Sequence, residues 1–410
     1  MREVCVLGLG YIGLPTASIL ATHGFAVTGV DIDPRTLKIL GRGDIHIEEP
    51  GLKTLFQASI KSKSLTFSRT PRPSDAFIIC VPTPADHATK KADLRAVKSA
   101  ARSIIPVLRP GNLVILESTV GPGTMHDVLL PILRKSRHWQ EGSILVAHCP
   151  ERVLPGQILR ELVANDRIIG GIDYKSALAA KEIYAKFCSG NIHLTDALTA
   201  ELAKLAENTF RDVNIAYANE LDRICEDLGA NTWEVIRLAN RHPRVKILDP
   251  GPGVGGHCIA IDPWFLAMAS PKKSRLIQTA RAINEHRPLE AAARIKAALA
   301  KTGKKHPIAV CLGLSYKANV DDFRESPAMD IFKNLLTDTR ITTLAVEPYG
   351  AKLNGSLPLT DLTTALNKAD VIAILVDQKE FMTLDWKHLI AQKGLANIID
   401  FRGIINKVAA

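Results

Sequence analysis

The chain lacks the features that mark several protein classes. Its 410 residues contain no uninterrupted apolar stretch of membrane-spanning length, no low-complexity tract and no short-period repeat. The seven cysteines are odd in number, widely spaced and without a CxxC pair, which argues against a disulfide framework and a zinc site. We therefore expect no metal site, no membrane partner and a reducing, cytoplasmic compartment.

Concentrated positive charge is also missing. The formal net charge is +10, but Lys and Arg are spread along the chain without a dense basic run, and aromatic residues make up only 5%. Nucleic-acid binding requires a clustered basic footprint, so phosphate-bearing small molecules are the favoured anionic partners. A hydrophobic content of 46% and a charged content of 23% fit a globular protein of two or three domains.

Strand and helix patterns divide the chain into three parts. β-rich runs alternate with helical periodicity in the first part, which predicts βαβ units and a mostly parallel sheet. The expected strands there are residues 3–9, 26–32, 75–82, 112–119, 143–150 and 167–172. From Asp196 to Gly229 the apolar spacing near 3.6 predicts one long helix, and further helices extend to about Leu299.

Strand and helix alternation then resumes. Strands are expected at residues 307–314, 341–348, 369–376 and 396–401. We therefore predict an α/β protein in which two Rossmann-like α/β domains, residues 1–195 and 300–410, are joined by an all-helical domain, residues 196–299. The long helix carries apolar residues beyond one face, which makes it a plausible dimer seam.

A glycine motif follows the first expected strand. GLGYIG places Gly8, Gly10 and Gly13 between a strand and a helix, where they permit a tight turn, close approach to a pyrophosphate and close helix–sheet packing. Asp31 ends the next strand, and an acid there accepts hydrogen bonds from a ribose 2′-OH, which favours NAD over NADP. Arg35 lies nearby and is able to accommodate a 2′-phosphate or to stack on adenine.

Polar residues end two further strands. Thr83 stands in VPTP, and Thr119 stands in EST beside Ser118. Ligands of an open α/β sheet bind outside the carboxyl ends of its strands, so we expect both threonines to meet a cofactor or substrate.

The long helix carries a candidate catalytic pair. Lys204 and Asn208 are four residues apart and share a face of the helix. Apolar neighbours place the Lys204 ammonium in a partly apolar setting, where it would stabilise an oxyanion or donate a proton.

A candidate nucleophile stands in GPGVGGHCIAID. Cys258 follows two glycines and is expected at the start of a helix, where the dipole and free N–H groups favour the thiolate. Asp262 lies four residues on, on the same face. A thiol beside a nicotinamide allows oxidation beyond the aldehyde, because it forms a thiohemiacetal that is oxidised to a thioester and then hydrolysed to an acid.

The chain resembles the nucleotide-sugar 6-dehydrogenases, the family of UDP-glucose, GDP-mannose and UDP-N-acetylhexosamine dehydrogenases. The resemblance covers essentially the whole chain and rests on GLGYIGLP, VPTP, EST, HCPERVLPG, ELAKLAENTFRDVNIAYANE, GVGGHCIAIDPWFL, GLSYKANVDDFRESP and DFRG. It implies oxidation of a sugar C6 alcohol to a carboxylate with two NAD per turnover. His257 and Ala260 imply UDP-N-acetyl-D-mannosamine as the substrate, with UDP-N-acetylglucosamine and UDP-glucose as alternatives.

The same resemblance implies roles for individual residues. The implied catalytic residues are Cys258 as nucleophile, Lys204 for the alkoxide and oxyanions, Asn208 and Asp262 for water and protons, Glu151 as proton acceptor and Thr119 for ordering water. The implied cofactor-binding residues are Gly8, Gly10, Tyr11, Ile12, Gly13, Asp31, Arg35, Thr83, Thr119 and Arg324. The implied substrate-binding residues are Glu151, Arg152, Val153, Lys204, Asn208, Arg211, His242, Arg244, Gly255, Lys317 and Arg402, with Arg244 reaching the site of a neighbouring subunit.

The sequence departs from the family pattern at one position, and two other functions stay open. Ile261 stands where UDP-glucose members commonly carry a Lys, so a role for that ammonium is not carried over. A two-electron dehydrogenase of the β-hydroxyacid type shares the cofactor domain and a catalytic Lys, but it has no need of residues 300–410. A dinucleotide-responsive, nucleic-acid-binding regulator is the non-enzymatic alternative.

Overall fold

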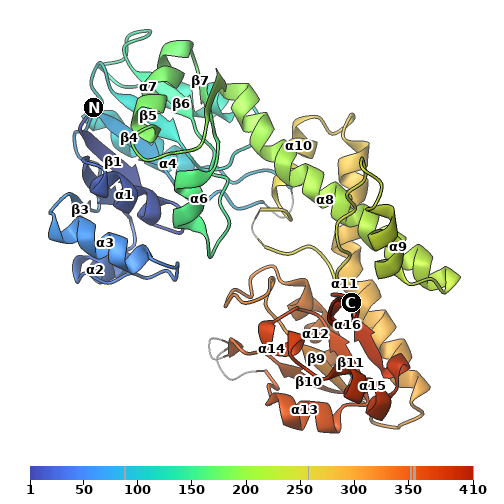
Figure 1. Ribbon diagram of the computed structural model, residues 1–410. Helices are drawn as coiled ribbons and strands as arrows, with labels where there is room; N and C mark the ends of the chain where they lie inside the picture. Colours follow the sequence, from blue (N-terminus) through green and yellow to red (C-terminus); the bar gives the residue numbers. More distant parts are fainter. Residues whose placement is uncertain (87–88, 257, 351–352, 354–356, 410) are drawn as a thin grey trace. The chain divides into compact units, whose positions relative to one another are not determined.

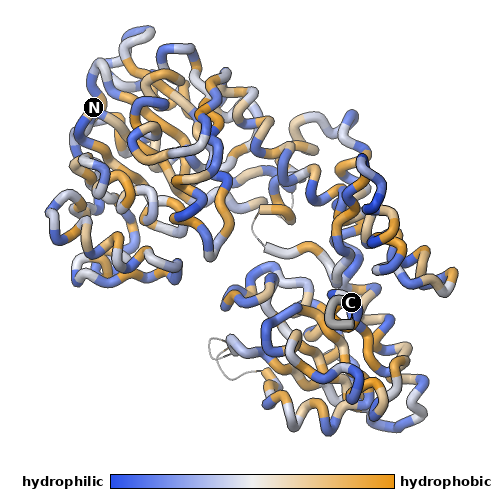
Figure 2. Tube along the Cα trace, viewed as in Figure 1, coloured by the Kyte–Doolittle hydropathy of each residue, from blue (hydrophilic) through white to orange (hydrophobic). Residues whose placement is uncertain are grey.

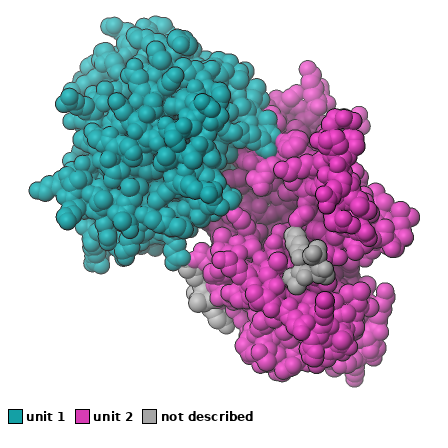
Figure 3. All heavy atoms as spheres, viewed as in Figure 1, with its two compact units in different colours: residues 1–207 teal, residues 208–410 magenta. Residues whose placement is uncertain are grey.

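The computed structural model describes residues 1–86, 89–256, 258–350, 353 and 357–409 (Figure 1). The chain forms two compact units, residues 1–207 and residues 208–410, shown in teal and magenta in Figure 3. The division falls within one long helix. The domain boundaries at 195/196 and 299/300 stay a prediction.

Unit 1 is built on an eight-stranded sheet. Its strands are β1 (Glu3–Leu7), β2 (Ala26–Val30), β3 (Leu65–Ser68), β4 (Ala76–Ile79), β5 (Leu113–Leu116), β6 (Leu145–His148), β7 (Arg167–Gly171) and β8 (Ile192–Asp196). The spatial order is β3-β2-β1-β4-β5-β6-β7-β8, and all neighbours are parallel except β6 and β7. The strand order reverses between β1 and β4, which is where ligands of doubly wound sheets bind.

Helices cover both faces of this sheet. They are α1 (Gly13–Thr22), α2 (Pro34–Gly41), α3 (Leu52–Lys61), α4 (Arg95–Ile104), α5 (Leu130–Leu133), α6 (Ile158–Ala164) and α7 (Tyr174–Tyr184), with a 3₁₀ helix η1 (Ile105–Val107) and a π-helical segment η2 (Met125–Leu129). Successive β1 residues alternate between two cores: Val4 packs on one face of the sheet and Cys5 on the other. Short apolar strands buried on both faces explain the continuous hydrophobic runs of the sequence.

The middle of the chain is helical. Its helices are α8 (Ala197–Leu228), α9 (Thr232–Ala239), α10 (Asp262–Ala269) and α11 (Arg275–Lys301). Gly229, with φ of 72°, follows the end of α8 in the left-handed conformation that commonly terminates helices. Among the helices of the described residues, none is both long and apolar enough to cross a bilayer.

The C-terminal part of unit 2 is a smaller parallel sheet. Its strands β9 (Ile308–Leu312), β10 (Thr342–Val346), β11 (Val371–Ile374) and β12 (Ile398–Asp400) lie in the order β10-β9-β11-β12. The helices are α12 (Pro327–Leu336), α13 (Leu362–Lys368), α14 (Lys379–Met382), α15 (Trp386–Lys393) and α16 (Ile404–Ala409), with a 3₁₀ helix η4 (Leu395–Asn397). Two further cores lie on its two faces, and the strands of both sheets are mostly hydrophobic in Figure 2.

The predicted fold class is confirmed: two Rossmann-like α/β parts are joined by helices that include one of 32 residues. Strands β3 and β8 were not predicted, because both are partly exposed and rich in polar residues. The expectation that Cys258 begins a helix is wrong. It lies in the turn before α10, and the Cys258 carbonyl accepts the Asp262 N–H at 2.8 Å.

Candidate active site

The glycine turn after β1 fits a dinucleotide. Gly8 has φ of 88°, and a Cβ added there would lie 2.8 Å from the Cys80 carbonyl oxygen. A Cβ on Gly13 would lie 1.8 Å from the Gly8 oxygen, so the turn and α1 pack too closely for a side chain. A Cβ on Gly10, in contrast, meets nothing within 4 Å. The backbone at Gly10 is therefore open to a ligand, as pyrophosphate binding requires.

Asp31 is fixed at the edge of this turn. Its Oδ2 accepts the Leu9 N–H at 3.0 Å, and its Oδ1 accepts the Asp33 N–H at 2.9 Å. Arg35 is largely exposed and pairs with Asp33 at 3.4 Å. The acid following β2 thus sits against the phosphate-binding turn, which fits an unphosphorylated ribose and NAD.

Hydrogen bonds join the segments that follow β4 and β5, and each is donated by a hydroxyl side chain. The Thr83 hydroxyl donates to the Thr119 carbonyl oxygen at 2.6 Å, and the Ser118 hydroxyl donates to the Val81 carbonyl oxygen at 2.7 Å. β4 also pairs with β1, so these residues follow strands at the edge where the glycine turn begins. The structure therefore brings Thr83 and Thr119 together, and their contact with a cofactor or substrate stays a prediction.

Glu151 is held on both carboxylate oxygens. Oε1 accepts the Arg152 N–H at 2.7 Å, and Oε2 pairs with the Arg167 guanidinium at 3.3 Å. The Arg152 side chain turns to α8, where it binds Glu207 at 2.6 Å, and it also donates to the Asp166 carbonyl oxygen. Val153 is half-buried against the unit 1 core.

Arg167 was missed by the sequence analysis. Its side chain is buried, and its guanidinium lies 4.7 Å from the Tyr184 ring centroid. Tyr184 in turn donates to the buried Glu117 at 2.6 Å. Burial, followed by the nearby Glu151 charge, raises the pKa of Glu117 above its ordinary value. An Arg on a strand carries no motif, so only the fold reveals that it faces two acids.

Lys204 is buried on α8, with 7% of its surface exposed. His148, which ends β6, lies close enough to Lys204 for the two groups to interact electrostatically. The His148 Nδ1 lies 2.8 Å from the Leu116 carbonyl oxygen, and burial lowers the pKa of His148 to about 4, with a further contribution from the Lys204 charge. The imidazole is therefore neutral near pH 7 and adds no second positive charge beside Lys204.

In unit 2, two predicted catalytic residues meet directly. The Asn208 Nδ2 donates to the Asp262 Oδ2 at 2.6 Å, and both side chains are buried. Cys258 is exposed, one turn before Asp262. The other cysteines are less accessible: Cys5, Cys149, Cys225 and Cys311 are buried, and Cys80 and Cys188 are half-buried. His257 lies outside the described residues.

The segment before Cys258, residues 251–256, is called the glycine loop here. A Cβ on Gly255 would lie 2.5 Å from the Glu325 carbonyl oxygen. Gly256, with φ of 85°, faces the Tyr316 ring, and its N–H donates to the Glu325 oxygen at 3.3 Å. The glycines therefore allow the loop to lie against residues 316–327, which contain Lys317 and Arg324.

The remaining basic residues differ in their surroundings. Arg402 donates to Asp377 at 3.0 Å, and its guanidinium lies beside Gly251. Arg324 pairs with Asp322 at 2.6 Å, and Lys317 is half-buried. Arg211 is exposed on α8. Arg244 and His242 are also exposed and contact each other after α9. Tyr11 is exposed and Ile12 half-buried at the start of α1.

Family models match the three parts of the chain in order. Residues 2–188 match the NAD binding domain of the UDP-glucose/GDP-mannose dehydrogenase family, residues 198–286 its central domain and residues 310–407 its UDP binding domain. The chain belongs to this family. As a UDP-glucose/GDP-mannose dehydrogenase family member, it is an NAD-dependent nucleotide-sugar dehydrogenase. This excludes the regulator and the β-hydroxyacid dehydrogenase considered from the sequence.

Similar proteins of this family span the whole chain. The UDP-N-acetyl-D-mannosamine dehydrogenase of Methanocaldococcus jannaschii is 48% identical over 411 residues, 99% of this chain and 93% of that protein. The NDP-N-acetyl-D-galactosaminuronic acid dehydrogenase of Ralstonia nicotianae is 47% identical over 414 residues, 98% and 96% respectively. The structure of a UDP-D-ManNAc dehydrogenase from Pyrococcus horikoshii matches with a TM-score of 0.89 and 39% identity, over 98% of this chain and 96% of that one.

Proposed function

We propose that the enzyme oxidises the C6 alcohol of UDP-N-acetyl-D-mannosamine to the carboxylate, with two NAD consumed per sugar. The observation that carries the four-electron reaction is the exposed Cys258 thiol, one turn from the buried Asn208–Asp262 pair, in a chain of this family. The sugar assignment is supported by relatives named for that substrate. UDP-N-acetylglucosamine and UDP-glucose remain alternatives, and the Ralstonia relative adds the N-acetylgalactosamine series.

The proposed chemistry balances in four steps. The C6 alcohol first loses a proton and a hydride to become an aldehyde. The Cys258 sulfur then adds to the aldehyde carbon, and the oxygen takes a proton to give a thiohemiacetal. Loss of a second proton and hydride gives a thioester, and water cleaves its C–S bond to release the acid and the thiol. NAD, held at the glycine turn of Gly8, Gly10 and Gly13, would supply the hydride acceptor for each oxidation.

Each catalytic side chain has a proposed task. The Lys204 ammonium stabilises the alkoxide and the later oxyanions, because a buried cation acts strongly on developing negative charge. Glu151 accepts a proton at the sugar, directly or through water, and Thr119 orders that water. Asn208 holds Asp262, and the pair orients water and protons at the thioester. The cofactor-binding and substrate-binding residues inferred from the sequence keep their assignments as proposals.

We also propose a homodimer or larger homo-oligomer built on α8. Phe210, Tyr217 and Ile224 repeat every seven residues, and 67%, 53% and 49% of their surfaces are exposed. A seven-residue repeat keeps large apolar groups on one helix face. Arg244 is proposed to reach the neighbouring site. We further propose that the chain has three domains, at 1–195, 196–299 and 300–410. We also propose a reducing, cytoplasmic compartment.

The decisive measurement is the NADH formed per sugar consumed. We expect two NADH per UDP-N-acetyl-D-mannosamine, and lower kcat/KM on UDP-N-acetylglucosamine, UDP-N-acetylgalactosamine, UDP-glucose and GDP-mannose. Cys258→Ser is expected to stall before acid release, because its hydroxyl is a weak nucleophile and a poor leaving group. Cys188→Ser, at a half-buried cysteine of unit 1, is the matched control and should retain turnover. One NADH per sugar, or normal acid release by Cys258→Ser, contradicts the mechanism.

A further inference from the structure

We propose that Asn219 and Arg287 are positioning residues for Cys258, which they control by anchoring the first residue of the glycine loop. The inference rests on the proposed function, because it assumes the nucleophilic role of Cys258. None of the motifs found in the sequence assigns a role to Asn219 or Arg287. Both belong to unit 2, as do the glycine loop and Cys258.

The anchor point is Gly251. Its N–H donates to the Asn219 Oδ1 at 2.9 Å, and its carbonyl oxygen accepts the Arg287 Nε–H at 3.0 Å. Asn219 is fully buried and Arg287 is 3% exposed. A buried backbone group that loses its hydrogen bond is costly, so these two bonds define where the loop leaves the helices.

The Asn219 side chain is itself oriented. Its Nδ2 donates to the Asn284 Oδ1 at 3.0 Å, which turns the Asn219 oxygen toward Gly251. The Asn284 Nδ2 donates to Asp212 at 2.8 Å, and Arg281 pairs with the same Asp212 at 2.7 Å. This chain of buried polar groups links α8 to α11 and fixes the orientation of the Asn219 side-chain amide.

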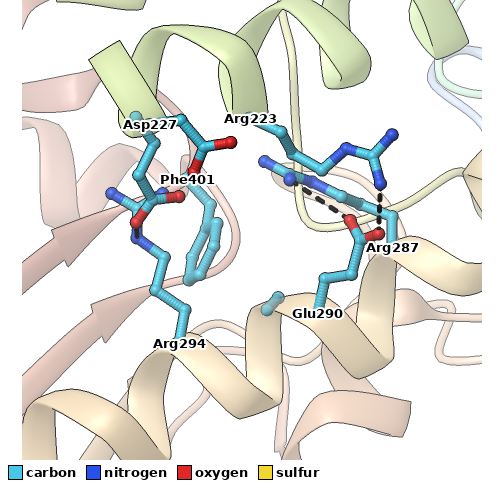
Figure 4. A pocket seen from close by; sticks show the side chains of 8 residues that line it. Arg223, Asp227, Arg287, Glu290, Arg294 and Phe401 are labelled. Atoms are coloured by element: carbon cyan, nitrogen blue, oxygen red, sulfur yellow. Dashed lines mark hydrogen bonds and ion pairs between the residues drawn. The ribbon is translucent and has the colours of Figure 1, made fainter. Parts of the chain in front are cut away.

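Arg287 is fixed from the other side. Its guanidinium pairs with Asp222 on α8 and, at 3.5 Å, with Glu290. In Figure 4, dashed lines join Glu290 to both the Arg287 and the Arg223 guanidinium groups. The fork geometry of Arg lets Nε bind the Gly251 carbonyl while the terminal nitrogens bind the acids, and a Lys ammonium does not reproduce this.

The pocket beside Arg287 is not itself proposed as a ligand site. It has a volume of about 270 Å³ and is lined mainly by paired charges from α8 and α11, with Phe401 at its wall (Figure 4). Its arginines are balanced by acids. Arg294 in this lining binds Glu226 at 3.0 Å and stacks on Phe401, and among the described residues it makes no hydrogen bond to Gly251.

The glycine loop, residues 251–256, is packed closely against its surroundings. A Cβ on Gly253 would lie 2.8 Å from Pro327 and 3.0 Å from Pro288, so the backbone passes directly against both rings. The far end is held by the Gly256–Glu325 hydrogen bond. Loss of the Gly251 bonds therefore removes one of the constraints that fix the loop before Cys258, and a shift near 1 Å in a reacting group costs up to about 100-fold in rate.

The test compares Asn219→Ala and Arg287→Lys with Arg294→Lys. Arg294→Lys is the matched control, because it makes the same change on the same helix and in the same ion-pair group but leaves the Gly251 bonds in place. In the two anchor variants we expect acid formation to fall about tenfold or more, with KM for the sugar within about threefold. A misplaced thiol captures the aldehyde less well, so NADH per sugar should fall below two and hydroxylamine should trap free aldehyde.

The number of NADH formed per sugar separates a misplaced Cys258 from a loss of stability. An unfolded fraction lowers the rate but leaves two NADH per sugar. A second readout is the alkylation of Cys258 by iodoacetamide without sugar, followed by peptide mass spectrometry. We expect it to be at least about threefold slower in both anchor variants and unchanged in Arg294→Lys. Two NADH per sugar together with wild-type alkylation in both anchor variants overturns the inference. One NADH per sugar in the wild-type enzyme overturns the proposed function instead, and the alkylation rates still decide the anchor.

Discussion

At the scale of the residue, His148 shows how burial sets a charge state. The ring is fully buried. Its Nδ1 lies 2.8 Å from the Leu116 carbonyl oxygen, and the charge of Lys204 acts on it. Protonation would place a second cation beside the proposed catalytic ammonium, where both side chains are buried. The folded protein therefore holds this imidazole neutral, and it does so at a cost in acid stability.

His148→Asn is predicted to flatten the acid side of the stability curve. The pKa of His148 is about 4 in the folded chain, against the ordinary 6.5, so between these values the unfolded chain binds a proton that the folded chain does not. Wild-type stability is therefore full above pH 6.5 and falls as the pH drops toward 4, by at most about 3 kcal/mol from this group. The asparagine amide keeps a donor near the Leu116 oxygen without titrating.

Urea unfolding of both proteins between pH 4.5 and 7.5 measures this difference. His193→Asn, at an exposed histidine paired with Asp166, serves as the control. Parallel pH curves for wild type and His148→Asn would show that His148 is not held neutral.

At the scale of the element, α8 uses opposite faces for different tasks. One face buries Asp212 and Asn219, which order α11 and the glycine loop. The other exposes the repeat of Phe210, Tyr217 and Ile224. A helix face that carries large apolar side chains is usually covered by another element. In the described chain, α11 packs on the face of Asp212 and Asn219, whereas the face of Phe210, Tyr217 and Ile224 stays exposed.

Tyr217→Asp is predicted to weaken self-association by at least about tenfold. A charge at the centre of the stripe would be desolvated in a helix–helix interface, at a cost of a few kcal/mol. Analytical ultracentrifugation across a concentration series measures the effect. Leu178→Asp, at an exposed leucine on α7, is the control and should assemble like the wild type. A monomeric wild-type enzyme, or an unchanged association constant in Tyr217→Asp, would contradict the seam.

At the scale of the whole molecule, the hydrophobic cores are separate. The two cores of the first sheet involve residues up to Ala197, and the two cores of the second begin at Ala291. The buried polar network of α8 and α11 lies between them in sequence. Cooperative unfolding follows shared cores, so each sheet has the means to melt on its own.

Calorimetry is therefore predicted to resolve two thermal transitions. NAD at 100 times its Kd should stabilise one by about 2.7 kcal/mol, and UDP at the same excess should stabilise the other by the same amount, because the NAD binding domain matches residues 2–188 and the UDP binding domain matches residues 310–407. ADP-ribose and uridine provide matched ligands that lack nicotinamide and diphosphate respectively. A single transition shifted equally by NAD and by UDP would contradict independent units.

The sequence by itself determined the cofactor turn, the fold class and the order of the parts. The glycine motif with Asp31 and the 3.6-residue period of α8 are visible as spacings in the sequence, so spacing alone was enough to predict them. Strands β3 and β8 escaped prediction because their exposed polar residues give no periodic signal.

Tertiary structure decided what spacing does not contain. Arg167 reaches Glu151 only because β7 runs beside β6, and Asn219 and Arg287 meet at Gly251 only because α8 and α11 come together. Single arginines and asparagines on regular elements look like ordinary surface residues in a sequence. Their pairing depends on contacts between distant segments, which set both the burial and the direction of each side chain.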